Sequence, residues 1–231
     1  MRIGRKSKIA IAVVGVPVVL TSIWGVSFAA GLGDWMGNWG STGFERSIRL
    51  PGDEVLPDAE NMGTKAISIR ATPEEIWPWL AQMGVGRAGM YSYDWIDRLI
   101  GSGAAVDGHS ATVIHPELQE RRVGDLMVFH PPSGLAYTVA KVSAPRLIVY
   151  QGQSLSQVTW TFYLLPNDDG TRLITRWRGA KSTGAAETVA NAVFGTMDFV
   201  MEQRMLARIK ELAEEHASDV RNVAIPLDVL K

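Results

Sequence analysis

The chain has 231 residues, a net charge of −1 and no cysteine. Hydrophobic residues make up 46% and charged residues 20%, which is typical of a folded protein and excludes extended disorder. The lack of cysteine excludes disulfides and thiolate chemistry. No basic run occurs past residue 8, so the sequence lacks the electrostatic footprint of a nucleic-acid-binding protein.

The N-terminal segment has the pattern of a membrane anchor. Basic residues within positions 2–8 precede an uncharged, largely apolar stretch, Ile9–Gly33. Because about 20 helical residues span the hydrocarbon core of a bilayer, this stretch predicts one transmembrane helix. A cleaved signal peptide is the alternative, since Ser27 and Ala29 are small residues at the spacing that signal peptidase reads. The positive-inside rule predicts a cytoplasmic N-terminus and an extracytoplasmic domain.

The next segment is rich in Gly, Pro and Asp and has no clear periodicity, so it predicts a linker or a wrapping segment. Trp35 and Trp39 at its start fit either an interfacial aromatic belt or packing on the domain. We therefore divide the chain into four parts: an anchor (1–33), a linker (34–63), a folded domain (64–217) and a tail (218–231).

The folded domain begins with a strand and two helices. Alternation predicts a strand over Lys65–Ala71. Thr72 is a good N-cap, and Pro73 and Glu75 suit the first turn of a helix that ends near Gly84. This helix presents Ile76, Trp77, Leu80 and Met83 as its apolar face. A second helix is predicted over Tyr93–Ile100, with Trp95, Ile96 and Leu99 facing inward.

A run of strands and a long helix complete the domain. Turn signals separate the strands, and Asn167–Gly170 between two alternating runs predicts a hairpin. The long helix is predicted over Glu187–His216, with an apolar stripe that includes Phe194, Met197 and Met201. Segregated elements in this order indicate an α+β fold. The predicted strands are Ala111–His115, Asp125–His130, Ala136–Val142, Leu147–Gln151, Gln157–Pro166 and Thr171–Arg178.

Ala71–Trp95 (ATPEEIWPWLAQMGVGRAGMYSYDW) resembles a signature of SRPBCC-type proteins, the superfamily of START lipid-transfer domains, Bet v 1 allergens and polyketide cyclases. Leu50–Glu54 (LPGDE), Val123–Asp125 (VGD) and Met197–Glu202 (MDFVME) resemble a bacterial, membrane-anchored subgroup. The resemblance implies a helix-grip fold, in which a curved antiparallel sheet wraps around a long C-terminal helix, with a hydrophobic cavity. It implies no single activity, because fold and function separate readily.

Several motifs have competing interpretations. Gly84–Gly89 matches G-x-G-x-x-G but follows a helix, so it predicts a turn and not a dinucleotide site. Arg87, together with Tyr91 and Tyr93, either orients a polar ligand head group or has a structural role in which Arg87 pairs with Asp94.

The predicted strands and long helix supply further candidates. Trp160 is expected in the core or at a cavity wall, whereas alternation places Arg176 and Arg178 together on a face expected to be solvated. The methionine stripe is expected to form the core or the floor of a cavity. The candidate ligand-binding residues are Arg87, Tyr91, Tyr93, Trp95, Phe129, Tyr137, Trp160, Phe194, Met197 and Met201.

No catalytic residue, metal site or cofactor is assigned. His109 and His115 would share a face of one continuous strand, but no metal-binding motif accompanies them. Asp125 follows Gly124 and is expected to close a turn. An edge or surface position is the default expectation for the histidines.

Three functions fit the sequence. The first is a membrane-tethered domain that binds a hydrophobic small molecule, such as a lipid, an isoprenoid or a polyketide-like metabolite. The second is a cyclase- or hydrolase-like enzyme that uses the same cavity. The third is a non-catalytic domain that binds a partner protein in a membrane assembly. Binding without catalysis is favoured, and the candidate acid–base groups for the second are Tyr91, Tyr93, Asp94, His115 and Asp125.

Overall fold

The computed structural model describes residues 31–103, 108–152, 157–180 and 185–223, without the side chains of 185–194 and 222–223. The predicted anchor, Ile9–Gly33, therefore lies almost wholly outside the described residues. Within these residues, no helix is both long enough and apolar enough to cross a bilayer. The chain falls into two compact units, of which one comprises residues up to Gly37 and the stretch Ser182–Phe199.

The smaller unit contains α3 (Gly33–Gly37) and the beginning of α7 (Ala185–Val223). The rings of Trp35 and Phe199 lie 5.4 Å apart, tilted by 60°. Trp35 is more than half exposed. Trp39 belongs to the larger unit and packs against its main core. Of the two alternatives for this residue, packing on the domain is therefore the one observed.

The larger unit is built on one antiparallel sheet, which has six strands in the described part of the chain. The spatial order is β1-β6-β5-β4-β3-β2, so β2 to β6 form a meander and β1 joins its far edge. Asn167 pairs with Gly170 at the β5–β6 turn, which confirms the predicted hairpin. The strands are β1 (Asn61–Ile69), β2 (Leu126–His130), β3 (Leu135–Ser143), β4 (Leu147–Gly152), β5 (Val158–Asn167) and β6 (Gly170–Gly179).

Helix α5 (Pro73–Gln82) begins as its sequence predicts. The Thr72 side chain accepts a hydrogen bond from Glu75 N, and the Glu75 side chain accepts one from Thr72 N at 2.7 Å. This capping box satisfies backbone donors that the first turn leaves unpaired. Ile76 and Leu80 are buried in the core as expected, and Trp79 is buried with them.

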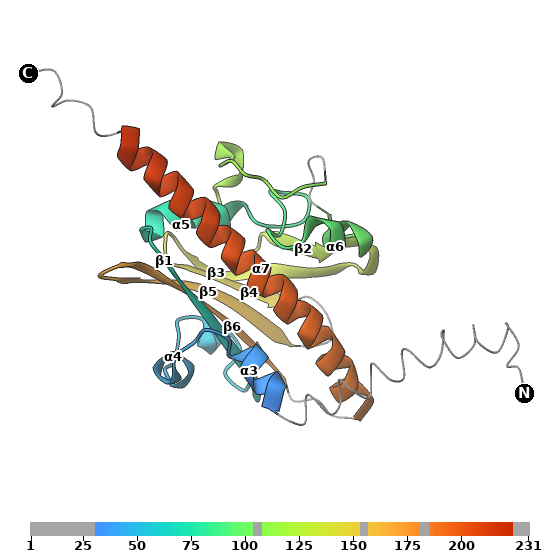
Figure 1. The fold of residues 1–231 in the computed structure, drawn as a ribbon. Coiled ribbons are helices and arrows are strands. Elements are labelled where there is room, and N and C mark those ends of the chain that lie inside the picture. The colour runs from blue at the N-terminus through green and yellow to red at the C-terminus, as the bar shows by residue number, and fades with distance from the viewer. Residues whose placement is uncertain (1–30, 104–107, 153–156, 181–184, 224–231) are drawn as a thin grey trace, which may run out of the picture. The chain divides into compact units, whose positions relative to one another are not determined.

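Helix α7 crosses the inner face of the sheet from Val200 onward (Figure 1). Its inner side includes Met205, Ile209 and Leu212, which pack with Phe162 and Leu164 of β5 in the main core. Side chains two residues apart on a strand share a face, so β5 turns its apolar side toward the helix. An antiparallel sheet that packs around a long C-terminal helix confirms the predicted α+β, helix-grip architecture.

The segment before β1 packs against the outer face of the sheet. It forms α4 (Gly43–Ser47) and a 3-10 helix, Asp53–Val55. Leu50 from this segment packs with Ala66 and Ile174 in a second, smaller core cluster. The residues just before α4 are also held against the sheet, because Gly40 O accepts a hydrogen bond from Arg172 Nη2 of β6 at 2.5 Å.

Arg176 of β6 is buried beneath this segment and Arg178 is partly buried, so the prediction of a solvated pair is wrong. Arg176 is 1% exposed and lies with Nη1 2.7 Å from Asp53 Oδ2. Arg178 also contacts Asp53, at 3.5 Å, and donates a hydrogen bond to Leu56 O. Alternation correctly places both side chains on one face of β6, but the outer face is covered by residues more than a hundred positions earlier.

Two local predictions also differ from the structure. No regular strand forms over Ala111–His115, which is followed by a 3-10 helix, Pro116–Leu118. Helix α6 (Asp94–Leu99) is present, but Trp95 and Leu99 are 61% and 78% exposed, and Asp97 is its buried residue. Hydrophobicity alone therefore predicts the wrong inward face, because Asp97 has a polar partner inside.

Candidate functional site

A row of aromatic rings lines the inner face of the sheet. Phe129 of β2 and Tyr137 of β3 lie with ring centroids 6.0 Å apart, and Tyr137 lies 6.3 Å from Trp160 of β5. Trp160 is buried, whereas Phe129 and Tyr137 are half-buried against the main core. The row thus begins inside the domain and reaches a partly accessible edge, as a wall for an apolar ligand would.

Glu202 of α7 lies at the buried end of this row. Its Oε1 atom accepts hydrogen bonds from Trp160 Nε1 at 3.2 Å and from Thr175 Oγ1 at 2.7 Å. Its Oε2 atom lies 2.5 Å from Lys65 Nζ, and both charged side chains are buried. These contacts hold Trp160 in one orientation and satisfy both carboxylate oxygens.

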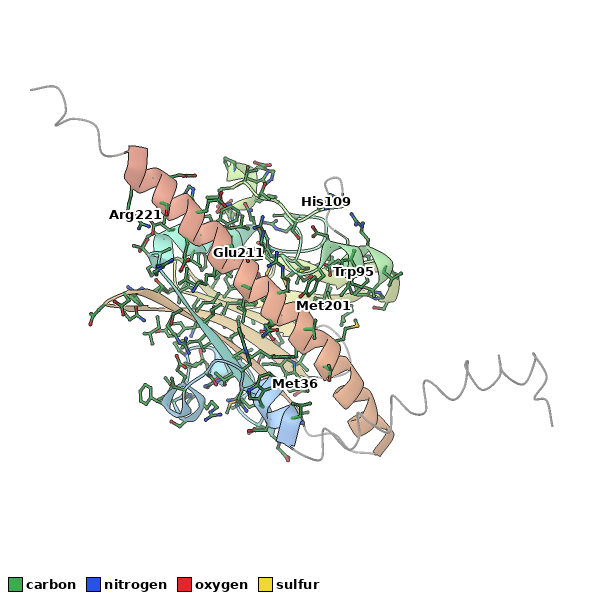
Figure 2. The ribbon with its side chains drawn as sticks, in the orientation of Figure 1. Met36, Trp95, His109, Met201, Glu211 and Arg221 are labelled. Atoms are coloured by element: carbon green, nitrogen blue, oxygen red, sulfur yellow. The ribbon has the colours of Figure 1, made fainter. Side chains whose placement is uncertain are left out.

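A polar cleft lies between α6, the loop after it and α7. It consists of two adjoining hollows of about 490 Å³ and about 480 Å³ that share part of their lining. We call both together the α6–α7 cleft. Figure 2 shows Trp95 and His109 on the elements beside α7, with Met201 and Glu211 on the helix itself. The cleft is lined by Tyr91, Ser92, Tyr93, Asp94, Trp95, Arg98, His109, Ser110, Thr112, Arg204 and Arg208.

Asp94 organises the floor of the cleft. Its Oδ1 atom accepts hydrogen bonds from the backbone N and the Oγ of Ser110, at 2.9 and 2.8 Å. Its Oδ2 atom lies 3.3 Å from His109 Nδ1, and His109 Nε2 lies 3.4 Å from Arg98 Nη1. Asp94 therefore fixes the loop that carries both Ser110 and His109.

Tyr91 is fully buried behind the cleft, with a backbone φ of 58°. Positive φ is uncommon for a bulky side chain and stores strain that surrounding contacts must offset. Tyr91 N donates a hydrogen bond to Ser110 Oγ at 3.0 Å, and Tyr91 Oη accepts one from Gln82 Nε2 at 2.7 Å. Burial raises the pKa of Tyr91 to about 12, so its hydroxyl stays protonated.

Asp97 is a second buried carboxyl below the cleft. Ser92 Oγ donates a hydrogen bond to Asp97 Oδ2 at 2.5 Å. Burial raises the pKa of Asp97 to about 6; the Ser92 hydrogen bond opposes this shift and the nearby charge of Asp94 adds to it. Asp97 thus contributes less negative charge to the cleft floor than an exposed aspartate does.

Three arginines line the cleft. Arg204 and Arg208, one turn apart on α7, each donate a hydrogen bond of 3.1 Å to a different oxygen of Glu211. Arg98 of α6 donates one of 3.2 Å to Gly108 O. The lining thus carries three positively charged guanidinium groups and one carboxylate, that of Asp94.

Arg87 has a structural role, but not with Asp94. Its Nη2 atom donates hydrogen bonds to Leu118 O at 2.7 Å and to Ala81 O at 3.4 Å. Arg121 donates to Ala81 O at 2.7 Å and also to Met83 O. Burial lowers the pKa of Arg87, and the like charge of Arg121 lowers it further. The two arginines cap carbonyls at the C-terminal end of α5, where cations are favourable.

The remaining candidates are distributed between the two units. Met201 is half-buried on α7, whereas Met197, in the smaller unit, is 41% exposed. The side chain of Phe194 lies outside those that the structure describes. Tyr93 and Trp95 line the α6–α7 cleft from α6 and the residue before it.

The other acid–base candidates lie away from the cleft. His115 Nδ1 lies 3.3 Å from Glu117 Oε1. Asp125 accepts a hydrogen bond from Arg122 N at 2.8 Å, which confirms the predicted turn. His130, a histidine outside this candidate group, contacts Ile100 O and Ser133 Oγ. Within the described residues, no group of three or more His, Cys, Asp or Glu side chains is placed to hold a metal ion.

Sequence reasoning missed the charged lining of the cleft. Arg204 and Arg208 are four residues apart and so share one side of α7, a signal that the sequence does contain. Arg98 and His109 come together only because the loop after α6 folds back onto it. No pattern within either segment indicates that approach.

No family model and no curated protein matches this chain. Among solved structures, protein MLL2253 from Mesorhizobium loti is 16% identical, with a TM-score of 0.41, over 67% of this chain and 98% of that chain. The di-domain ARO/CYC StfQ from the steffimycin biosynthetic pathway is 17% identical, with a TM-score of 0.44, over 71% and 54%. The Aha1 dimer from Colwellia psychrerythraea is 14% identical, with a TM-score of 0.40, over 67% and 96%.

Proposed function

We propose that this protein is a membrane-tethered domain that binds a hydrophobic small molecule between the inner face of its sheet and α7. The observation that carries the proposal is the aromatic row, because Phe129 and Tyr137 remain half-buried beside the main core. An apolar ligand that covers these rings removes their exposed area from water, which is favourable in proportion to the area buried. A lipid, an isoprenoid or a polyketide-like metabolite has the required chemistry.

The orientation of Trp160 supports the same site. Its indole N–H donates a hydrogen bond to Glu202, so the rest of the ring needs no polar partner and can contact an apolar ligand. Aromatic walls with few, fixed polar groups are typical of small-molecule sites. Met201 on α7 is half-buried and supplies a side chain that adapts to irregular ligands.

Native mass spectrometry of the full-length chain, purified in a mild detergent, tests the proposal. We expect a co-purified apolar molecule, whose occupancy falls roughly tenfold in Phe129→Ala and Tyr137→Ala. Phe44→Ala is the matched control, because Phe44 is an exposed aromatic residue of α4, in the segment on the outer face. Equal occupancy in all three variants would contradict the proposal.

The tether is the second part of the proposal. It rests on the uncharged stretch Ile9–Gly33 and on the basic residues before it, which predict a cytoplasmic N-terminus. A protease-protection assay on intact cells or spheroplasts checks the orientation. We expect the domain to be cleaved from outside, and protection of the domain would overturn the assignment.

A second candidate function is catalysis in the α6–α7 cleft. One observation favours it: Asp94 Oδ2 lies 3.3 Å from His109 Nδ1, and a carboxylate in this position orients an imidazole for proton transfer. Four of the acid–base groups named from the sequence contact residues outside that group: Tyr91 contacts Gln82, Asp94 contacts Ser110, His115 contacts Glu117 and Asp125 contacts Arg122. Turnover of a bound ligand that is lost in His109→Gln, with binding retained, would support this alternative.

A further inference from the structure

The lining of the α6–α7 cleft has an excess of positive charge. Arg98, Arg204 and Arg208 face it, and Asp94 is the carboxylate among its lining residues. The two oxygens of Asp94 are already engaged by Ser110 and His109. The guanidinium groups therefore dominate the field that a small molecule in this cleft experiences.

The charge of the α7 arginines is only half balanced. Both Arg204 and Arg208 donate to Glu211, a single carboxylate. Burial raises the pKa of Glu211, but the hydrogen bonds and the positive charges of Arg208 and Arg204 together outweigh it, so the net pKa is lowered. Glu211 therefore stays ionised and orients the two guanidinium groups, yet it leaves one net positive charge for a third partner.

Two contacts connect the elements of the cleft to the aromatic row. On α7, Glu202, two residues before Arg204, accepts a hydrogen bond from Trp160 Nε1. On α7, Met201 lies one turn before Arg204, so the two residues are neighbours on the helix surface. The C-terminal end of α6 is joined to β2, because His130 lies with Nε2 2.5 Å from Ile100 O, directly after Phe129. These contacts connect α7 and the end of α6 to both features, the arrangement that a ligand with a polar end and an apolar end requires.

We infer that the ligand is an anionic amphiphile, whose carboxylate or phosphate head group is held by Arg98, Arg204 and Arg208 in the α6–α7 cleft. The inference rests on the proposed function, since it places the apolar part of the same molecule on the aromatic row. Guanidinium groups suit both head groups, because their planar donors match the oxygens of carboxylates and phosphates.

Equilibrium binding of tritiated probes to the immobilised full-length chain, in one fixed nonionic detergent, tests the inference. The probes are decanoic acid, decyl phosphate and decan-1-ol, which share one apolar chain. We expect both anions to bind roughly tenfold more tightly than the alcohol. This preference should shrink as salt rises, because the cleft is open to solvent and its charges are screened.

The outcomes separate the inference from the proposed function. Equal affinity for the acid and the alcohol would overturn the anionic head group while leaving the apolar site in place. No binding of any of the three probes would overturn both. Inorganic phosphate is the fourth probe. If an equal concentration of inorganic phosphate displaces decyl phosphate, the cleft binds a free anion and the inference of an amphiphilic ligand is overturned.

Variants locate the head group. Arg204→Gln with Arg208→Gln should abolish the preference for the two anions over decan-1-ol. Arg204→Lys with Arg208→Lys keeps the charge and should retain part of the preference. Arg122→Gln is the matched control, because Arg122 is an exposed arginine that pairs with Glu120. A full preference in the double glutamine variant would contradict the assignment.

Discussion

Lys65 of β1 and Glu202 of α7 form an ion pair inside the domain, with Nζ 2.5 Å from Oε2, although 137 residues separate them in sequence. The other oxygen of Glu202 accepts hydrogen bonds from Trp160 and Thr175. One carboxylate thus ties the long helix to three strands of the sheet. It also sets the position of the aromatic ring at the buried end of the proposed ligand site.

Glu202→Gln is expected to destabilise the domain by about 3–5 kcal/mol, because it removes one charge of the buried ion pair between Glu202 and Lys65. Lys65→Met combined with Glu202→Leu should recover most of this loss, since a buried ion pair replaced by apolar groups is often neutral in stability. Urea denaturation measures both. Glu211→Gln, at a half-exposed carboxylate, is the control, and an equally small effect at both glutamates would contradict the expectation.

Arg176→Lys is expected to destabilise the domain by about 2–4 kcal/mol, because lysine cannot reproduce the fork of the guanidinium. Arg176 donates hydrogen bonds to Thr64 Oγ1, Ile48 O, Glu45 O and Asp53 Oδ2. Its loss should loosen the segment before β1, which limited proteolysis detects as earlier cleavage between residues 40 and 60. The exposed Arg70→Lys is the control; equal proteolysis of the two variants would show that Arg176 does not hold the segment.

Gly40→Ala and Gly134→Ala form a matched pair that tests the close approach of the wrapping segment. Both glycines have a φ near 70°, so alanine costs each about 1 kcal/mol in backbone strain. A Cβ at Gly40 would lie 2.3 Å from Ala66 O, whereas one at Gly134 would meet nothing within 4 Å. We expect Gly40→Ala to lower the free energy of unfolding by a further ~1–3 kcal/mol. Equal losses would mean that the segment is not held against β1.

Asp97→Asn is expected to change how stability depends on pH. The folded-state pKa of Asp97 is raised to about 6 from 3.8, chiefly by burial. A raised carboxyl pKa means that the folded state binds the proton more tightly than the unfolded state does. The stability that Asp97 contributes to the folded state is therefore fully present below pH 3.8 and is lost as pH rises through about 6. The loss is on the order of 2 kcal/mol.

Unfolding free energies measured between pH 4 and pH 7 check this sign. Other carboxyls titrate in the same range, so the informative quantity is the difference between the wild type and Asp97→Asn. We expect the variant to gain stability relative to the wild type as pH rises through this window. A difference that stays constant with pH would contradict the raised pKa.

The start of α5 and the β5–β6 hairpin follow from the sequence by itself. Thr72 and Glu75, three positions apart, form reciprocal hydrogen bonds, and Asn167 pairs with Gly170 at the same separation. Such contacts form within one turn of chain, so the residues that determine them are adjacent in sequence. The order of elements then determines the α+β class, because amphipathic strands and a long amphipathic helix must bury their apolar faces together.

Burial and pairing of charged side chains were decided by the tertiary structure. Alternation places Arg176 and Arg178 on one face of β6, but only the segment containing Asp53 makes that face an interior. The pattern of α6 predicts Trp95 inward, yet Asp97 is buried because Ser92 meets it there. Arg98, Arg204 and Arg208 line one cleft although two of them lie over a hundred residues from the third. Local periodicity reports which residues share a face, and only the packing of distant segments decides what that face meets.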